Sequence, residues 1–96
     1  MKITHHSGQC RFIATNEDGE VMGEIAYQPD GDILQANHTQ TQERFQGQGV
    51  AGKLLDALVE YARKENLKIV PICSYVVHAF EKDPERFRDV SLRPND

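Results

Sequence analysis

The stretch Arg44-Phe45-Gln46-Gly47-Gln48-Gly49-Val50-Ala51-Gly52-Lys53 decides how this chain is organised. Upstream of it, short β-prone runs alternate with turn residues, which predicts a meander of strands. Downstream of it, apolar residues recur at intervals of three and four, which predicts an amphipathic helix. The stretch therefore joins a strand to the first turn of a helix.

A glycine-rich turn in this position can hold an anion. The first amides of a helix have no partner inside it, and the helix dipole places roughly half a positive charge there. Gly47 and Gly49 permit unusual backbone angles, and a side chain at position 52 could obstruct a ligand. The alternative is a tight strand–helix joint without a ligand. Such a joint does not need Gly52, which costs about 1 kcal/mol of helix stability relative to alanine.

Two common phosphate loops do not fit these residues. The Walker pattern needs Gly-Lys-Ser or Gly-Lys-Thr, which the chain lacks. The dinucleotide pattern needs a strand directly before the glycines and an acid at the end of the next strand, and neither condition fits well. The turn therefore favours a diphosphate ligand of another kind.

The elements around the turn follow from periodicity and from turn residues. Strands are expected at 10–15, 21–28 and 33–41, separated by turns at 16–19 and 29–32. Strict alternation in the third strand predicts that one face carries Leu34, Ala36, His38 and Gln40. Cys10 is expected to be structural, within the first of these strands.

The second half of the chain predicts a β-α-β unit. The helix starts near Val50 and is expected to stop at Asn66. A buried strand follows at 68–73, and a shorter helix at 74–82 that Asp83-Pro84 should end. Pro71 has no amide hydrogen, so its strand is expected to be unpaired on one side for part of its length. The tail from residue 85 is too polar to assign, although Phe87, Val90 and Leu92 could pack as a last short element.

Composition limits the class of protein. The 96 residues fit one domain spanning 1–96, with 39% apolar residues and a net charge of −4. An acidic chain is a poor ligand for nucleic acid, and no apolar run is long enough to span a bilayer. Two cysteines do not make a disulfide framework and no secretory signal is visible, which indicates a cytoplasmic protein. The histidines lack metal-binding spacing, so no metal site is expected.

Three segments in the same order resemble a known family. Gln46-Gly47-Gln48-Gly49-Val50-Ala51 matches the Gln/Arg-x-x-Gly-x-Gly/Ala motif of the GCN5-related N-acetyltransferases. His38-Thr39 before it and Cys73-Ser74-Tyr75 after it are similar to segments of the minimal branch of that family. The resemblance extends from about Phe12 to Val90. It implies an α+β (mixed α/β) fold with two helices and a mostly antiparallel sheet, whose two central strands splay apart around the pantetheine arm of acetyl-CoA.

The resemblance also implies a reaction and a cofactor site. The reaction is acetyl transfer from acetyl-CoA to an amine on a protein, a peptide or a small molecule. The backbone amides of residues 48–52 would hold the pyrophosphate. The whole cofactor-binding set is Gln46, Gly47, Gln48, Gly49, Val50, Ala51, Gly52 and Lys53. The chain lacks the helices that follow the first strand in larger members and wall the acceptor site. We expect a monomer or a weak dimer.

Three residues are candidates for the chemistry, each with a structural alternative. Cys73 precedes a helix, where a thiolate is favoured, so it could carry the acetyl group; it could equally be a small buried residue. His38 could act as the base or orient Cys73, or be a histidine bonded to backbone at the core edge. Tyr75 could protonate the leaving thiolate, or its ring could simply pack.

Two other functions stay open from the residues alone. One is a module that holds acetyl-CoA or CoA without efficient turnover, such as a sensor. The other is a protein-interaction domain without a cofactor, which leaves the glycine cluster unexplained.

Overall fold

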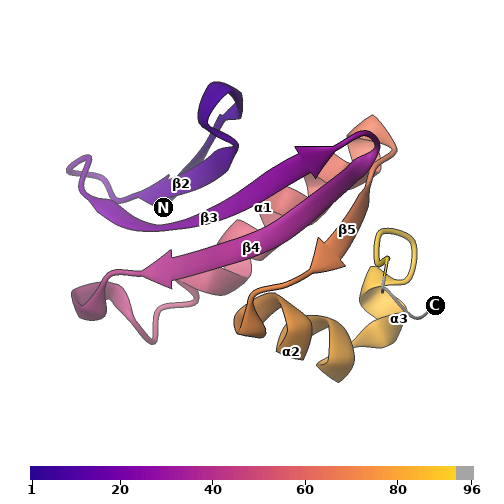
Figure 1. Cartoon of the computed structure of the whole chain (residues 1–96). Coiled ribbons are helices and arrows are strands. Elements are labelled where there is room, and N and C mark those ends of the chain that lie inside the picture. Colours follow the sequence, from indigo (N-terminus) through magenta and orange to yellow (C-terminus); the bar gives the residue numbers. More distant parts are fainter. Residues whose placement is uncertain (93–96) are drawn as a thin grey trace.

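The computed structural model describes residues 1–92 and contains one five-stranded sheet with helices (Figure 1). The strand order follows the chain order, from β1 at one edge to β5 at the other. Strands β1 to β4 are antiparallel neighbours, and β5 returns parallel to β4 after the long helix. The strands are β1 (Lys2–His6), β2 (Arg11–Thr15), β3 (Val21–Asp30), β4 (Ile33–Thr41) and β5 (Lys68–Pro71). The helices are α1 (Val50–Glu65), α2 (Ser74–Lys82) and α3 (Pro84–Phe87), with short 3-10 turns at Ser7–Gln9 and Glu43–Phe45.

Local side-chain chemistry fixes the two turns between the middle strands. In the β2–β3 turn, the Asn16 side-chain oxygen accepts hydrogen bonds from the amides of Asp18 and Glu20. Gly19 has φ +81°, and Gly31 in the β3–β4 turn has φ +62°. Both values lie in the left-handed region that glycine adopts without strain. The turns expected at 16–19 and 29–32 are therefore confirmed, although β3 continues through Asp30.

Helix α1 supplies most of the core. Its buried stripe packs against β2, β3 and β4 and consists of Val50, Leu54, Leu55, Leu58, Val59 and Ala62. Asn66 ends the helix at φ +61°, and its amide donates to carbonyls of the last turn. The helical spacing and the stop at Asn66 are both confirmed, because a left-handed residue satisfies carbonyls that the helix leaves free.

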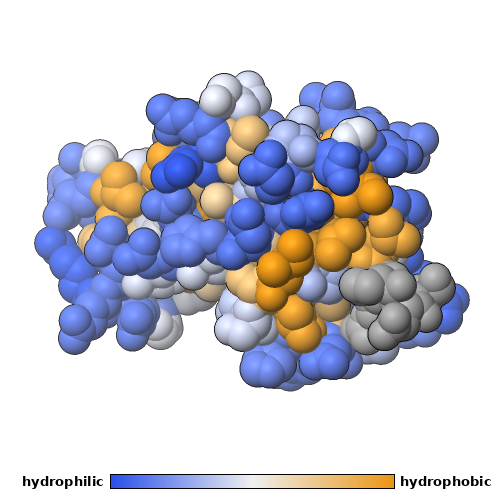
Figure 2. All heavy atoms as spheres, viewed as in Figure 1, coloured by the Kyte–Doolittle hydropathy of each residue, from blue (hydrophilic) through white to orange (hydrophobic). Residues whose placement is uncertain are grey.

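The other face of the sheet is not covered by α1 (Figure 1). Figure 2 shows this side as hydrophilic over the middle strands and apolar toward β5 and α2. Ile72, which follows β5, is 49% exposed. The sheet thus has one packed face and one open face, as antiparallel sheets commonly do.

Two parts of the fold differ from the expectations. Strand β1 was not predicted, because Lys2–His6 contains a single aliphatic residue, and its pairing with β2 is what makes it a strand. Cys10 lies before β2 rather than in it, with a left-handed φ of +56°. The tail, in contrast, packs as a last short element as expected: α3 buries Phe87, Val90 is buried, and Ile69 of β5 exchanges backbone hydrogen bonds with Val90 and Leu92.

Candidate active site

The glycine loop, residues 46–49, has the conformation that the sequence pattern requires. Gly47 has φ +82° and Gly49 has φ +77°. A Cβ atom at either position would meet no atom within 4 Å, so backbone geometry alone explains the glycines there. Gly49 is the N-cap of α1 and has no side chain to cap the helix. The helix amides are therefore left to an external partner.

A run of free amides lies at the start of α1. The Gln46 amide bonds to the Glu43 carbonyl, and the Lys53 amide bonds to the Gly49 carbonyl. Between them, the amides of residues 47–52 donate no hydrogen bond to any part of the chain that the structure describes. Consecutive free amides at a helix N-terminus form an anion site, because the helix dipole acts in the same direction.

A hollow of about 240 Å³ lies against these amides. It is lined by Thr41 of β4, by Tyr75 of α2, and by the loop residues Gln46, Gly47, Gly49, Val50, Ala51 and Gly52. A Cβ atom at Gly52 would lie 3.7 Å from the Tyr75 hydroxyl oxygen, an ordinary contact distance. The first turns of α1 and α2 therefore meet at this hollow.

Strands β4 and β5 separate at the same place. Their pairing ends at Ala36 and Pro71, and the amides of Ile72 and Cys73 both donate to the Ala36 carbonyl. Beyond that point β4 continues to Thr41 with β3 as its only strand partner among residues 1–92, while the chain after Pro71 turns into α2. We call this region the opening: it is bounded by residues 37–41, Cys73 and the glycine loop. The splaying of two adjacent strands and the one-sided pairing expected near Pro71 are confirmed, although β5 is an edge strand of the described sheet and not a central one.

A β-bulge changes which side chains of β4 face the opening. Ala26 pairs with His38 but Tyr27 pairs with Ala36, so Asn37 is an extra residue. Beyond it, Thr39 lies opposite the fully buried Ile25 on the face that α1 covers. The predicted placement of His38 and Gln40 beside Leu34 and Ala36 is therefore wrong: both are exposed on the open face.

Cys73 contacts Thr39 rather than His38. The Cys73 sulfur and the Thr39 hydroxyl oxygen are 3.2 Å apart and form a hydrogen bond. Cys73 is half-buried and is the N-cap of α2, with its carbonyl accepting from the Val77 amide. The structure thus brings Cys73 into the opening and leaves His38 on the outer side of β4.

Tyr75 is the second residue of α2 and is 39% exposed. Burial raises the pKa of its hydroxyl above the usual 10.0, and the Asp56 carboxylate raises it further. The side chain is therefore protonated at neutral pH, and its hydroxyl lies near Gly52 in the hollow.

Sequence reasoning missed two residues of the opening, Thr39 and Thr41. Both lie on the inner face only because of the bulge at Asn37. The residues next to Asn37 include no glycine or proline, the residue types that usually mark a bulge in a sequence. The His-Thr pair was noted before the fold was known, but alternation favoured His38 over Thr39.

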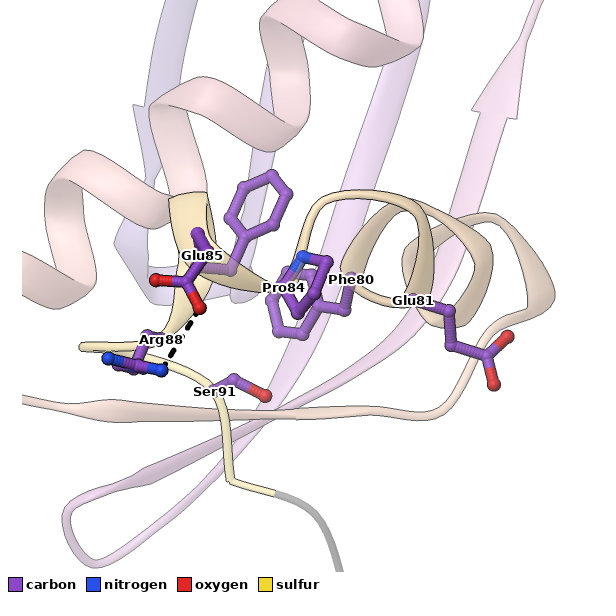
Figure 3. A pocket seen from close by; sticks show the side chains of 7 residues that line it. Phe80, Glu81, Pro84, Glu85, Arg88 and Ser91 are labelled. Carbon is purple, nitrogen blue, oxygen red and sulfur yellow. Dashed lines mark hydrogen bonds and ion pairs between the residues drawn. The ribbon is translucent and has the colours of Figure 1, made fainter.

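Another hollow lies away from the opening. Its volume is about 360 Å³, and it lies between α2, α3 and the segment after them, with Phe80 and Pro84 in its wall and an ion pair between Glu85 and Arg88 at 3.0 Å (Figure 3). It shares no lining residue with the hollow at the glycine loop. Residues 1–92 contain no cluster of three His, Cys, Asp or Glu side chains that could hold a metal ion. Within the same residues, no helix is long and apolar enough to cross a membrane.

Comparison with known proteins assigns the family. The family model for GCN5-related N-acetyl-transferases matches residues 11–90. A GCN5-like candidate N-acetyltransferase from Staphylococcus aureus is 35% identical, with a TM-score of 0.75 over 96% of this chain and 88% of that one. Two more distant structures share the fold. One is a GNAT-family N-acetyltransferase from Escherichia coli in complex with CoA, which is 20% identical with a TM-score of 0.63 over 72% of this chain and 42% of that one. The other is Tetrahymena GCN5, which is 13% identical with a TM-score of 0.64 over 75% of this chain and 48% of that one.

This chain spans less than half the length of the last two proteins. The match to the family model and to the Staphylococcus aureus protein nevertheless covers most of the chain, including the glycine loop, the opening and Cys73. The chain belongs to the GCN5-related N-acetyltransferases, enzymes that take the acetyl group from acetyl-CoA and transfer it to an amine.

Proposed function

We propose that acetyl-CoA lies across the opening, with its diphosphate on the amides of residues 47–52. The support is that these amides have no partner in the described chain and that the hollow lies directly against them. Gln46 and Lys53 flank the diphosphate, and Lys53 adds a positive charge. The pantetheine arm then extends between β4 and β5, where residues 37–41 have no strand partner on the β5 side.

This path carries the thioester toward Cys73, which we propose as an acetyl carrier. The Cys73 sulfur attacks the carbonyl carbon, a new carbon–sulfur bond forms, and the bond to the CoA sulfur breaks. The Cys73 thiol gives its proton to water as it attacks, and the CoA thiolate takes up a proton as it leaves. An amine then attacks the acetylated cysteine and regenerates the thiol. The alternative is direct attack of the amine on acetyl-CoA, with Cys73 as a wall of the opening.

Tyr75 and His38 fit different proton transfers. Tyr75 is protonated at neutral pH and lines the same hollow as the glycine loop. We therefore propose that the Tyr75 hydroxyl donates a proton to the CoA thiolate. His38 lies on the open face, where an amine can approach without displacing α1. We therefore assign it the proton that the amine loses.

We further propose a cationic or macromolecular amine as the acceptor. No helix of the described residues covers the open sheet face beside the opening, and the chain carries a net charge of −4. A reducing, cytoplasmic compartment fits the two free thiols, Cys10 and Cys73. Residues 1–96 would act as one domain, as a monomer or a weak dimer.

The observation that carries this function is the run of free amides, and two glycines test it as a matched pair. Gly49 in the loop has φ +77° and Gly19 in the β2–β3 turn has φ +81°, and a Cβ atom has free space at both. Alanine at either position should lower stability by a similar amount, about 1 kcal/mol, because of its left-handed backbone.

Only Gly49→Ala should also weaken CoA binding, by about tenfold or more, because it disturbs the amides that hold the diphosphate. Isothermal titration with CoA measures this. Equal CoA affinity in Gly49→Ala and Gly19→Ala would contradict the site. Tight CoA binding by the wild-type protein without acetyl transfer to any amine would favour the sensor over the enzyme.

A further inference from the structure

The hydroxyl group of Thr39 is placed to control the sulfur of Cys73. The two atoms are 3.2 Å apart, and both side chains are half-buried. A hydroxyl donates a hydrogen bond to a thiolate more strongly than to a neutral thiol, because the acceptor then carries a full charge. The Thr39 hydroxyl can therefore support the negative charge on the Cys73 sulfur while it attacks a thioester.

The backbone holds each partner of this contact in place. Thr39 is fixed by its pairing with Ile25 in the middle of the sheet. Cys73 is fixed by its amide, which donates to the Ala36 carbonyl at 2.9 Å, and by its position at the start of α2. The hydrogen bond thus spans the point where β4 and β5 separate, and neither residue can move away without breaking strand or helix contacts.

The β-bulge is what selects Thr39 for this position. If Asn37 paired regularly with Ala26, His38 would lie opposite Ile25 on the inner face and Thr39 would turn to the open face. A bulge leaves the extra residue unpaired and interrupts the regular hydrogen bonds between the strands. Bulges are common beside active sites, where they change the direction of a side chain. Here the result is a small hydroxyl, rather than an imidazole, next to Cys73.

We infer that Thr39 is a positioning residue for the Cys73 sulfur, and that the bulge at Asn37 is the device that brings it there. The inference rests on the proposed role of Cys73 as acetyl carrier. Thr39 donates its hydrogen bond to the Cys73 sulfur, keeps it directed into the opening, and supports the thiolate during attack on the acetyl carbon.

Three variants test this inference. Thr39→Val keeps the shape of the side chain and removes the hydroxyl, Thr39→Ser keeps the hydroxyl, and Thr15→Val makes the same exchange on β2, away from the opening. The first measurement is the rate of Cys73 alkylation by iodoacetamide between pH 6 and pH 9, with the modified residue located by peptide mass. The second is acetylation of Cys73 after incubation with acetyl-CoA.

Thr39→Val should slow both reactions of Cys73 by about tenfold at pH 7, the factor that corresponds to one lost hydrogen bond to a charged group. It should also move the alkylation profile to higher pH. Thr39→Ser should restore most of the rate, and Thr15→Val should match the wild type. CoA affinity should be unchanged in all three variants.

Two outcomes would overturn the inference: an unchanged alkylation profile in Thr39→Val, or a Thr39→Ser variant as slow as Thr39→Val. Failure of the proposed function is a separate result, because it shows as full amine acetylation by Cys73→Ala. In that case alkylation of Cys73 still reports on Thr39. If Cys73 is the carrier, the Thr39→Val exchange should change acetyl transfer in the wild type and have no effect on it in a Cys73→Ala background.

Discussion

The two halves of β4 differ although they belong to one strand. Residues 33–36 pair with β3 on one side and β5 on the other, and their inner side chains, Leu34 and Ala36, are fully buried. Residues 37–41 pair with β3 alone, begin with a bulge, and have no buried side chain. We call the first the closed half and the second the open half. The comparison shows that the fold is stabilised in one half of the strand and leaves backbone free for a ligand in the other.

The largest expected effect is on stability in the closed half. Leu34 is 2% exposed, so Leu34→Ala should lower the free energy of unfolding by about 3 kcal/mol through lost burial and a cavity. Thr39→Ala in the open half should cost less than about 1 kcal/mol. Urea denaturation of the two variants measures this difference. Similar losses would mean that the halves do not differ in their contribution to the fold.

Deletion of Asn37 should turn the open half into a continuation of the closed one. Ala36 and His38 then become neighbours in the chain, so Thr39 stays opposite Ile25 and its hydroxyl stays beside the Cys73 sulfur. We therefore expect Thr39→Val to slow iodoacetamide modification of Cys73 about tenfold in the deletion variant, as it does in the full chain. Circular dichroism provides the check that the sheet persists. A folded deletion variant in which Thr39→Val has no effect would contradict the register assigned to β4.

A pH effect on stability should come from the far edge of the sheet. The Nε2 atom of His5 in β1 lies 2.6 Å from the Tyr27 hydroxyl oxygen. The His5 ring also stacks on the Phe12 ring, with 4.1 Å between the ring centres, and contacts the Tyr61 ring in an edge-on arrangement. Burial lowers the pKa of His5 below 6.5, and neighbouring His6 lowers it further. Burial also raises the pKa of Tyr27 to about 12.

The signs of both shifts define a stability plateau. As the pH falls below about 6.5, the unfolded chain binds a proton at His5 before the folded chain does, so stability decreases. As the pH rises from about 10 to about 12, the unfolded chain loses the Tyr27 proton first, so stability decreases again. Thermal unfolding of His5→Phe should lack part of the acid decrease, whereas His78→Ala should retain it. An acid limb identical in all three proteins would exclude His5 as its source.

The smallest expected effect is at the ion pair on the open face. Arg11 of β2 and Glu24 of β3 are 2.8 Å apart, with side chains 38% and 24% exposed. Solvent screening limits such pairs, so Glu24→Gln should change the free energy of unfolding by less than about 1 kcal/mol. Urea denaturation at low and high salt measures it. A loss as large as that of Leu34→Ala would show that the open face stabilises the sheet more than its exposure indicates.

The sequence predicted the parts of the fold that local chemistry determines. The apolar stripe of α1, the Asn16 and Gly31 turns and the glycine loop each depend on residues within one element or one turn. Strand β1 was not predictable from Lys2–His6, because its pairing and the aromatic ring contacts of His5 are contacts with distant residues.

The candidate site was predictable where it depends on motifs and not where it depends on register. Gly47, Gly49, Cys73 and Tyr75 were identified before the fold was known, and the structure brings them to one opening. Thr39 was not singled out, because the bulge that turns it inward has no local signal in the residues around Asn37. A one-residue change of register exchanges the two faces of a strand.

The most direct test of the account is the response of backbone amides to acetyl-CoA, measured by two-dimensional proton–nitrogen NMR spectroscopy. Binding of the diphosphate to the glycine loop and of the pantetheine arm to the open half predicts large shifts for residues 47–52 and 37–41. The closed half, residues 33–36, should shift little. A saturable response confined to the closed half, or shifts that leave residues 47–52 unchanged, would contradict the placement of the cofactor.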